Sequence, residues 1–172
     1  LVRLFGPLPM NLHNELDHND TPLTPVAEVY AQIVADLTAA EACNLPVKYT
    51  ATNRAINGAN IYVSVQTVKA TLAAVYLAMA GYPLNQSSYY AQAAAKAKEV
   101  IDGVNNGTYP QSLLADWAQV YSYGNNYHDE SMLNLFYMPR TGGWSNGDSQ
   151  FSSCHQVQSL GGWGDFLAER RY

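Results

Sequence analysis

Two tryptophans lie in a stretch of the sequence that is rich in glycine, serine and asparagine, between residues 139 and 164. A sugar ring presents an apolar C–H face and a rim of hydroxyls, which suit flat aromatic rings and Asn or Tyr side chains respectively. We therefore predict a ligand-binding platform that consists of Trp144, Trp163, Tyr127, Asn126 and Asn146. The alternative is that the two indole rings pin this loop onto the core.

The acidic residues of the sequence predict no catalytic pair. A glycosidase needs two carboxylates about 5 to 9 Å apart across a cleft. The candidates are Asp116, Asp129, Glu130, Asp148, Asp165 and Glu169, and nothing in their spacing pairs them. Cys154 and His155 are neighbours in sequence, whereas a catalytic Cys–His pair is brought together by the fold. We expect no catalytic residues, and hence no enzyme.

A polar run near the N-terminus contains the types of residue that bind metal ions, namely His13, Glu15, Asp17, His18 and Asp20. Their spacing matches neither the calcium-binding loop nor the HExxH zinc motif, so we expect a solvated acidic loop, with no metal and no cofactor. The two cysteines are Cys43 and Cys154. We expect two separate, small buried side chains, with a single disulfide in an oxidising compartment as the alternative.

The charge of the chain excludes two classes of partner. Nine basic residues oppose 14 acidic ones, for a net charge of −5 over 172 residues, and the basic residues do not cluster. Nucleic acid and anionic lipid surfaces both require such clusters. The longest apolar run, residues 70–80, is too short to span a bilayer. No signal peptide precedes Leu1, and we expect an internal part of a longer protein.

Apolar residues spaced three and four apart predict helices over residues 24–45, 63–80 and 89–102, after a loop over residues 1–23. Thr24 is expected to cap the first helix, with Pro25 at its first position. Gly81 and Gly103 are expected to end the second and third helices. The last two helices would form an antiparallel hairpin, the unit of tetratricopeptide-type solenoids. Its predicted interface consists of Leu72, Val75, Tyr76, Ala94, Ala97 and Ile101.

The rest of the chain predicts less regular structure. A short helix is expected over residues 112–121, with Trp117 in the core, and a strand over residues 131–138. The fold class is therefore mainly α, with tetratricopeptide-like helical hairpins, long irregular loops and a short strand. We predict a single partial domain over residues 1–172. Residues 24–121 would be the helical scaffold, and residues 122–172 the strand and loop region.

Six segments, in this order, resemble conserved motifs of the SusD/RagB family of outer-membrane nutrient-binding lipoproteins. They are Leu-Val-Arg-Leu-Phe-Gly-Pro-Leu-Pro at 1–9, the helix at 24–37 with its following Leu45-Pro46, the helix at 68–77, the helix at 90–101, Tyr109, and Glu-Ser-Met-Leu at 130–133. One departure is Glu169-Arg170-Arg171, where the family usually has Asp-x-Arg. Members run to several hundred residues, so this chain resembles an internal third.

The resemblance implies a function without catalysis. Family members are surface-exposed lipoproteins of the Gram-negative outer membrane that capture oligosaccharides, or sometimes peptides, for a SusC-like TonB-dependent transporter. Polysaccharide utilisation and nutrient uptake are therefore the expected context. The alternative is a helical-repeat protein–protein interaction module that binds no glycan. An interaction module needs an exposed apolar groove on residues 24–103, whereas a glycan binder needs an exposed Trp144 or Trp163.

Overall fold

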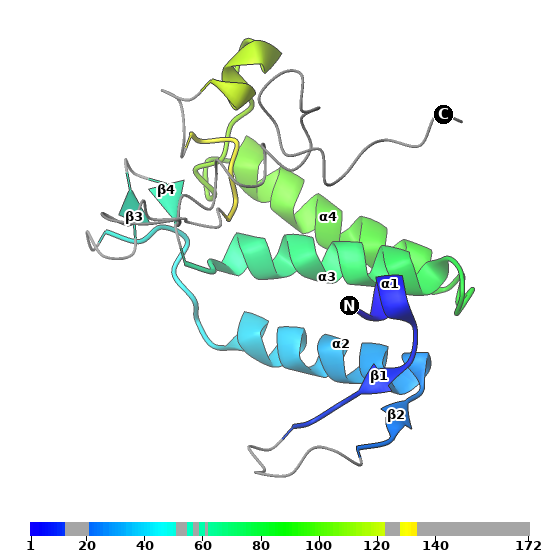
Figure 1. The fold of residues 1–172 in the computed structure, drawn as a ribbon. Coiled ribbons are helices and arrows are strands. Elements are labelled where there is room, and N and C mark those ends of the chain that lie inside the picture. The colour runs from blue at the N-terminus through cyan, green and yellow to red at the C-terminus, as the bar shows by residue number, and fades with distance from the viewer. Residues whose placement is uncertain (13–20, 51–54, 57–58, 61, 123–127, 134–172) are drawn as a thin grey trace, which may run out of the picture. The chain divides into compact units, whose positions relative to one another are not determined.

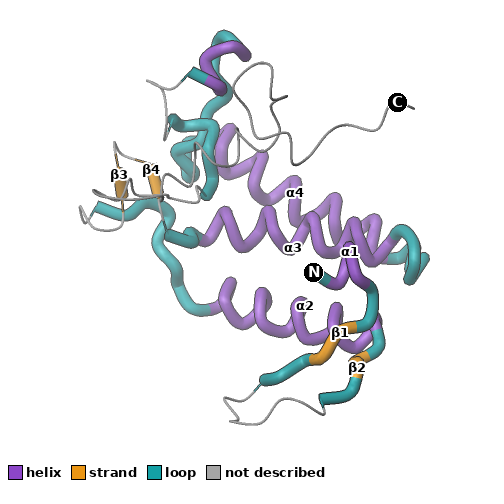
Figure 2. The backbone as a smooth tube through the Cα atoms, viewed as in Figure 1, coloured by secondary structure: helices purple, strands orange, loops and turns teal. Residues whose placement is uncertain are grey.

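The structure is a computed structural model that describes residues 1–12, 21–50, 55–56, 59–60, 62–122 and 128–133. Most of its regular structure is helical, and its strands have only two residues each (Figures 1 and 2). The elements are α1 (Val2–Phe5), β1 (Leu8–Pro9), β2 (Leu23–Thr24), α2 (Val26–Ala42), β3 (Ala55–Ile56), β4 (Ala59–Asn60), α3 (Val65–Ala80), α4 (Tyr89–Asn105) and the 3-10 helix η1 (Trp117–Tyr121). The prediction of a mainly α fold is confirmed.

The three long helices lie side by side, with α3 between α2 and α4 (Figure 1). Helix α3 contributes more residues to the buried core cluster than any other element, because it is covered from both sides. The buried core cluster consists of Val2, Val29, Tyr30, Val68, Leu72, Tyr76, Met79 and Ala93. The rings of Tyr76 on α3 and Tyr89 on α4 stack with their centroids 5.5 Å apart. Of the described helices, none is long and apolar enough to cross a membrane.

The N-terminal segment is more ordered than a loop. Helix α1 is followed by an antiparallel ribbon in which β1 pairs with β2, Leu8 opposite Thr24 and Pro9 opposite Leu23. The prediction that Thr24 caps the next helix is wrong, because Thr24 belongs to this ribbon and α2 begins at Val26 without a side-chain cap. A second ribbon, β3 with β4, forms where the sequence predicted only a polar connector.

The two glycines predicted to end helices behave differently from expectation. Gly81 does follow the last residue of α3, but its backbone is extended (φ −92°, ψ −169°) rather than left-handed. Gly103 ends no helix: it lies buried inside α4, which continues to Asn105. The backbone N–H of Tyr109 donates to Gly103 O at 2.9 Å, and the Tyr109 ring packs where a side chain at position 103 would stand. A close approach by this ring therefore requires glycine there.

The predicted hairpin exists, but α4 turns a different face toward α3. On α3, Leu72 and Tyr76 are buried as predicted and Val75 is half-buried. On α4, Ala94 and Ile101 are exposed, contrary to prediction, and Ala97 is half-buried. The buried residues of α4 are Ala93, Val100 and Gly103. The predicted apolar face of α4 is thus shifted by one residue from the observed one. Alanines on both sides of α4 give little contrast between its faces in the sequence.

Further predictions are corrected for the chain after α4 and for Cys43, which follows α2. Trp117 is 74% exposed, so it is not a core residue, and the segment contains a 3-10 helix from 117 rather than a helix from 112. Residues 131–133 are not in a strand, and residues 134–138 of the predicted strand lie outside the described residues. Cys43 is exposed rather than buried, and Cys154 lies outside the described residues, so their pairing stays untested.

Candidate functional site

The predicted platform falls entirely outside the part of the chain that the structure describes. This holds for Asn126, Tyr127, Trp144, Asn146 and Trp163. It also holds for the predicted acidic loop, residues 13–20, and for Asp148, Cys154, His155, Asp165 and Glu169. The platform therefore stays a prediction.

Two of the acidic candidates within the described residues, Asp116 and Glu130, accept hydrogen bonds from the backbone. Asp116 accepts a hydrogen bond from the Ala118 N–H at 3.0 Å and thereby caps η1. Glu130 accepts from the Leu114 N–H at 3.1 Å and so joins two segments 16 residues apart. Among the described residues, no three His, Cys, Asp or Glu side chains are placed to hold a metal ion. These carboxylates orient the backbone.

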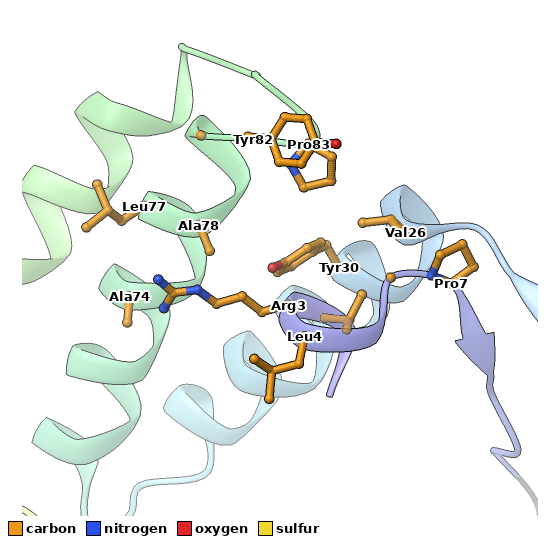
Figure 3. Close-up of a pocket in the computed structure, with 13 residues that line it drawn as sticks. Arg3, Leu4, Pro7, Val26, Tyr30, Ala74, Leu77, Ala78, Tyr82 and Pro83 are labelled. Atoms are coloured by element: carbon orange, nitrogen blue, oxygen red, sulfur yellow. The ribbon is translucent and has the colours of Figure 1, made fainter. Parts of the chain in front are cut away.

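A pocket of about 670 Å³ opens between α1, α2 and α3 (Figure 3). Its position follows from the sequence: Val2 is buried and anchors α1 onto the core, while Gly6 (φ 73°) turns the chain toward β1. Leu4 and Leu77 line the pocket from α1 and α3, and both are mostly exposed. Its other apolar lining includes Val26, Ala74, Ala78, Tyr82 and Pro83.

Two polar groups reach this otherwise apolar pocket. The Arg3 guanidinium extends from α1 toward α3, and the buried Tyr30 ring points its hydroxyl to the pocket side (Figure 3). Arg3 is exposed and has no ion pair among the described residues. A guanidinium recognises carboxylates by paired hydrogen bonds. The pocket therefore combines an apolar lining with one guanidinium and one phenol hydroxyl.

Comparisons with known proteins point to one family. No family model matches this chain, and no curated protein matches it. A crystal structure of a SusD superfamily protein from Parabacteroides distasonis ATCC 8503 does, at 31% sequence identity and a TM-score of 0.63 over 80% of this chain. This chain has a SusD-like fold. The resemblance recognised in the sequence is confirmed, and so is the predicted fold class.

The SusD-like chain spans 27% of the length of the solved protein that it matches. The match therefore compares this chain with about a quarter of a SusD superfamily protein. The ligands and partners of a whole protein of this kind do not follow from such a match.

A cluster of four charged side chains ties together the three long helices of the SusD-like fold. Lys69 on α3 lies 2.5 Å from Glu99 on α4 and 3.5 Å from Glu41 on α2. Lys96 on α4 lies 2.9 Å from Glu41 and 3.0 Å from Glu99. Three of these side chains are at most a quarter exposed, so water screens the cluster less than it screens a surface pair.

The charges of this cluster stabilise one another, as the pKa directions show. The hydrogen bond from Lys69 lowers the pKa of Glu99, and the same bond raises the pKa of Lys69. Burial acts to lower the pKa of Lys96, but hydrogen bonds to Glu41 and Glu99 outweigh it, and the pKa is raised. All three stay charged at neutral pH, and the cluster fixes the scaffold rather than performing chemistry.

The sequence reasoning missed both the pocket and the charged cluster. The pocket depends on α1, a single helical turn that begins in a segment predicted as a loop. The cluster joins residues from three different helices, so no local spacing signals it. The one usable signal was that Lys69 falls on the half-buried side of α3, where a lysine requires a partner.

Proposed function

We propose that this SusD-like chain is part of a non-catalytic, surface-exposed lipoprotein of a Gram-negative outer membrane. It binds oligosaccharides, or other nutrients such as peptides, and works with a SusC-like TonB-dependent transporter. The observation that carries this proposal is the 31% identity to a SusD superfamily protein across 80% of the chain. A protein of this kind is attached to the membrane by a lipid anchor.

The ligand platform in this proposal consists of Trp144 and Trp163 with Tyr127, Asn126 and Asn146. Indole faces would stack on the C–H faces of sugar rings, while the amide and phenol groups would bond to the hydroxyls. An aromatic contact of this kind contributes about 0.5 to 1.5 kcal/mol, so affinity has to be built from several contacts. Binding would therefore be weak per site and would favour oligosaccharides over single sugars.

The test replaces each platform tryptophan by alanine in the intact protein. Trp144→Ala and Trp163→Ala should each weaken oligosaccharide binding about 2- to 10-fold, the factor that the stacking energy corresponds to, with the melting temperature nearly unchanged. Trp117→Ala is the matched control, because Trp117 is an exposed indole outside the platform. If the platform variants melt at much lower temperature while the folded fraction binds normally, the two tryptophans are core anchors and the platform is wrong.

A second candidate function is a helical-repeat interaction module without glycan binding, and one observation favours it. The pocket between α1, α2 and α3 is an exposed apolar groove within and beside the helical scaffold. In the SusD-like proposal, this groove serves contact with a protein partner in addition to glycan binding. In the interaction-module proposal, it is the whole binding surface.

The two candidates separate when both activities are measured on the same variants. Leu4→Asp and Leu77→Asp place a charge in the groove, and Leu12→Asp is a control at another exposed leucine. Co-purification with the purified SusC-like transporter of the same organism is measured beside oligosaccharide binding. Glycan binding by the wild type and by all three variants supports the SusD-like proposal. A groove-dependent protein contact without any glycan binding supports the interaction module.

A further inference from the structure

A second pocket, of about 270 Å³, lies at the C-terminal half of α4. One wall is apolar and consists of Val100, Ile101 and Val104. The other wall comes from the chain after α4 and includes Leu113 and Met132. Hydrogen bonds position this second wall: the Ser112 N–H donates to Asp129 O at 3.2 Å, and the Thr67 hydroxyl donates to Met132 O at 2.9 Å.

A residue that lines this pocket carries an unpaired acceptor. Gln111 lines it, and the Gln111 Oε1 atom is buried and accepts no hydrogen bond. The Gln66 Oε1 atom is also buried without a partner, but the Gln66 amide is held in place because its Nε2 donates to Val47 O at 2.8 Å. Among the described residues, no hydrogen bond holds the Gln111 amide in the same way. A buried acceptor without a donor is unfavourable, and such a group signals a partner that has still to be supplied.

The other polar groups of the pocket extend the same chemistry. Glu130 uses Oε2 to accept from the Leu114 N–H, and a carboxylate has room for further donors. The exposed side chains of Ser112 and Asn105 can each donate and accept. The pocket thus combines an apolar wall with two acceptor groups and with two side chains that can both donate and accept hydrogen bonds. A purely apolar ligand would leave Gln111 Oε1 unpaired, so it does not fit.

We propose that this pocket binds one sugar ring, or a cyclic polyol of similar size. The C–H face of the ring packs on Ile101 and Val104, and one ring hydroxyl donates to Gln111 Oε1. The volume lies just below the range of about 300 to 1,000 Å³ typical of drug-sized ligands, which suits a single ring rather than an oligosaccharide. The choice of a carbohydrate rests on the proposed function, but the site is separate from the platform at Trp144 and Trp163.

The test is a ligand-observed NMR titration of the intact protein with D-glucose, D-galactose and D-mannose, and with cyclohexanol as a ring with a single hydroxyl. Gln111→Leu keeps the shape of the side chain and removes the acceptor. It should weaken binding of the preferred sugar at least fivefold without lowering the melting temperature. Gln92→Leu, at an exposed position of α4, is the matched control and should bind as the wild type does.

A second variant keeps the test independent of Gln111. Ser112→Phe fills the pocket with a ring and retains the backbone hydrogen bond to Asp129, so it should abolish binding of the single sugar. Wild-type affinity in Gln111→Leu, or tighter binding of cyclohexanol than of every sugar, overturns the proposal. Oligosaccharide binding that depends on Trp144 and Trp163, with no effect of either pocket variant, overturns the pocket alone. Absence of all carbohydrate binding overturns both the pocket and the proposed function.

Discussion

Helices α3 and α4 form the two arms of one hairpin and have nearly equal lengths, 16 and 17 residues, yet they are buried very differently. Helix α3 buries seven residues, because α2 covers one side and α4 the other. Helix α4 buries three and keeps most of its surface in solvent. The central helix therefore carries the stability of the scaffold, whereas the edge helix leaves side chains such as Ile101 and Val104 available to line a pocket.

The largest effect should come from the centre of α3. Leu72 is 0% exposed, so Leu72→Ala leaves a cavity and should lower the free energy of unfolding by about 2 to 5 kcal/mol. Leu77→Ala is the control on the same helix, because Leu77 is 56% exposed and should change stability by about 0.5 kcal/mol or less. Urea unfolding followed by circular dichroism measures both. Equal losses for the two variants would contradict the central position of α3.

The face that α4 presents to α3 can be tested with two adjacent alanines. Ala93 is buried and Ala94 is exposed. Ala93→Trp overpacks the helix contact and should cost about 1 to 3 kcal/mol, whereas Ala94→Trp should stay within about 0.5 kcal/mol of the wild type. The same unfolding experiment compares them. If Ala94→Trp is the more destabilising of the two, the phase predicted from the sequence is right and the observed one is wrong.

The charged cluster should contribute less than the apolar core, and its effect should depend on pH. Glu99→Gln removes a carboxylate that bonds to Lys69 and Lys96, and should cost about 1 kcal/mol at pH 7. Because the pKa of Glu99 is lowered in the folded state, its contribution is present above its ordinary pKa of 4.5 and is lost as the pH falls through the lower folded value. The stability difference between wild type and variant should therefore shrink as the pH falls below 4.5.

The raised pKa of Lys69 gives a contribution to stability that is lost at high pH rather than at low pH. Its contribution to stability is fully present below the ordinary lysine pKa of 10.5 and is lost only as the pH rises through the higher folded value.

Asp102→Asn is the control for Glu99→Gln, because Asp102 pairs with Lys98 on the exposed side of α4. If Asp102→Asn lowers the free energy of unfolding as much as Glu99→Gln does, the ion pairs that join three helices are no more stabilising than an exposed pair within one helix.

The two arms of the hairpin also show what sequence patterns can and cannot predict. On α3, the large apolar residues Val68, Leu72, Tyr76 and Met79 recur at three- and four-residue spacing, and Leu72 and Tyr76 are buried as predicted. On α4, alanines occur on both faces, and the decisive contact is the Tyr109 ring over Gly103, which depends on a turn beyond the helix. The buried face of a helix can be predicted from the sequence where its side chains are large, and periodicity alone is not enough.

The sites depend still more on contacts between distant parts of the chain. The pocket at Gln111 requires α4 and the segments around 112 and 130 to meet, and the pocket at Arg3 requires α1, a helix too short to have an apolar period. Neither could be found from spacing. The platform at Trp144 and Trp163 was inferred from residue type and family resemblance, and it stays a prediction.

The central claim, a SusD-like protein that binds glycans without cleaving them, is tested most directly by one paired measurement. A panel of soluble oligosaccharides is titrated into the intact protein by calorimetry, and each mixture is then assayed for new reducing ends. The account predicts saturable binding to at least one oligosaccharide and no increase in reducing ends after prolonged incubation. Release of reducing sugar, or the absence of binding across the whole panel, would contradict it.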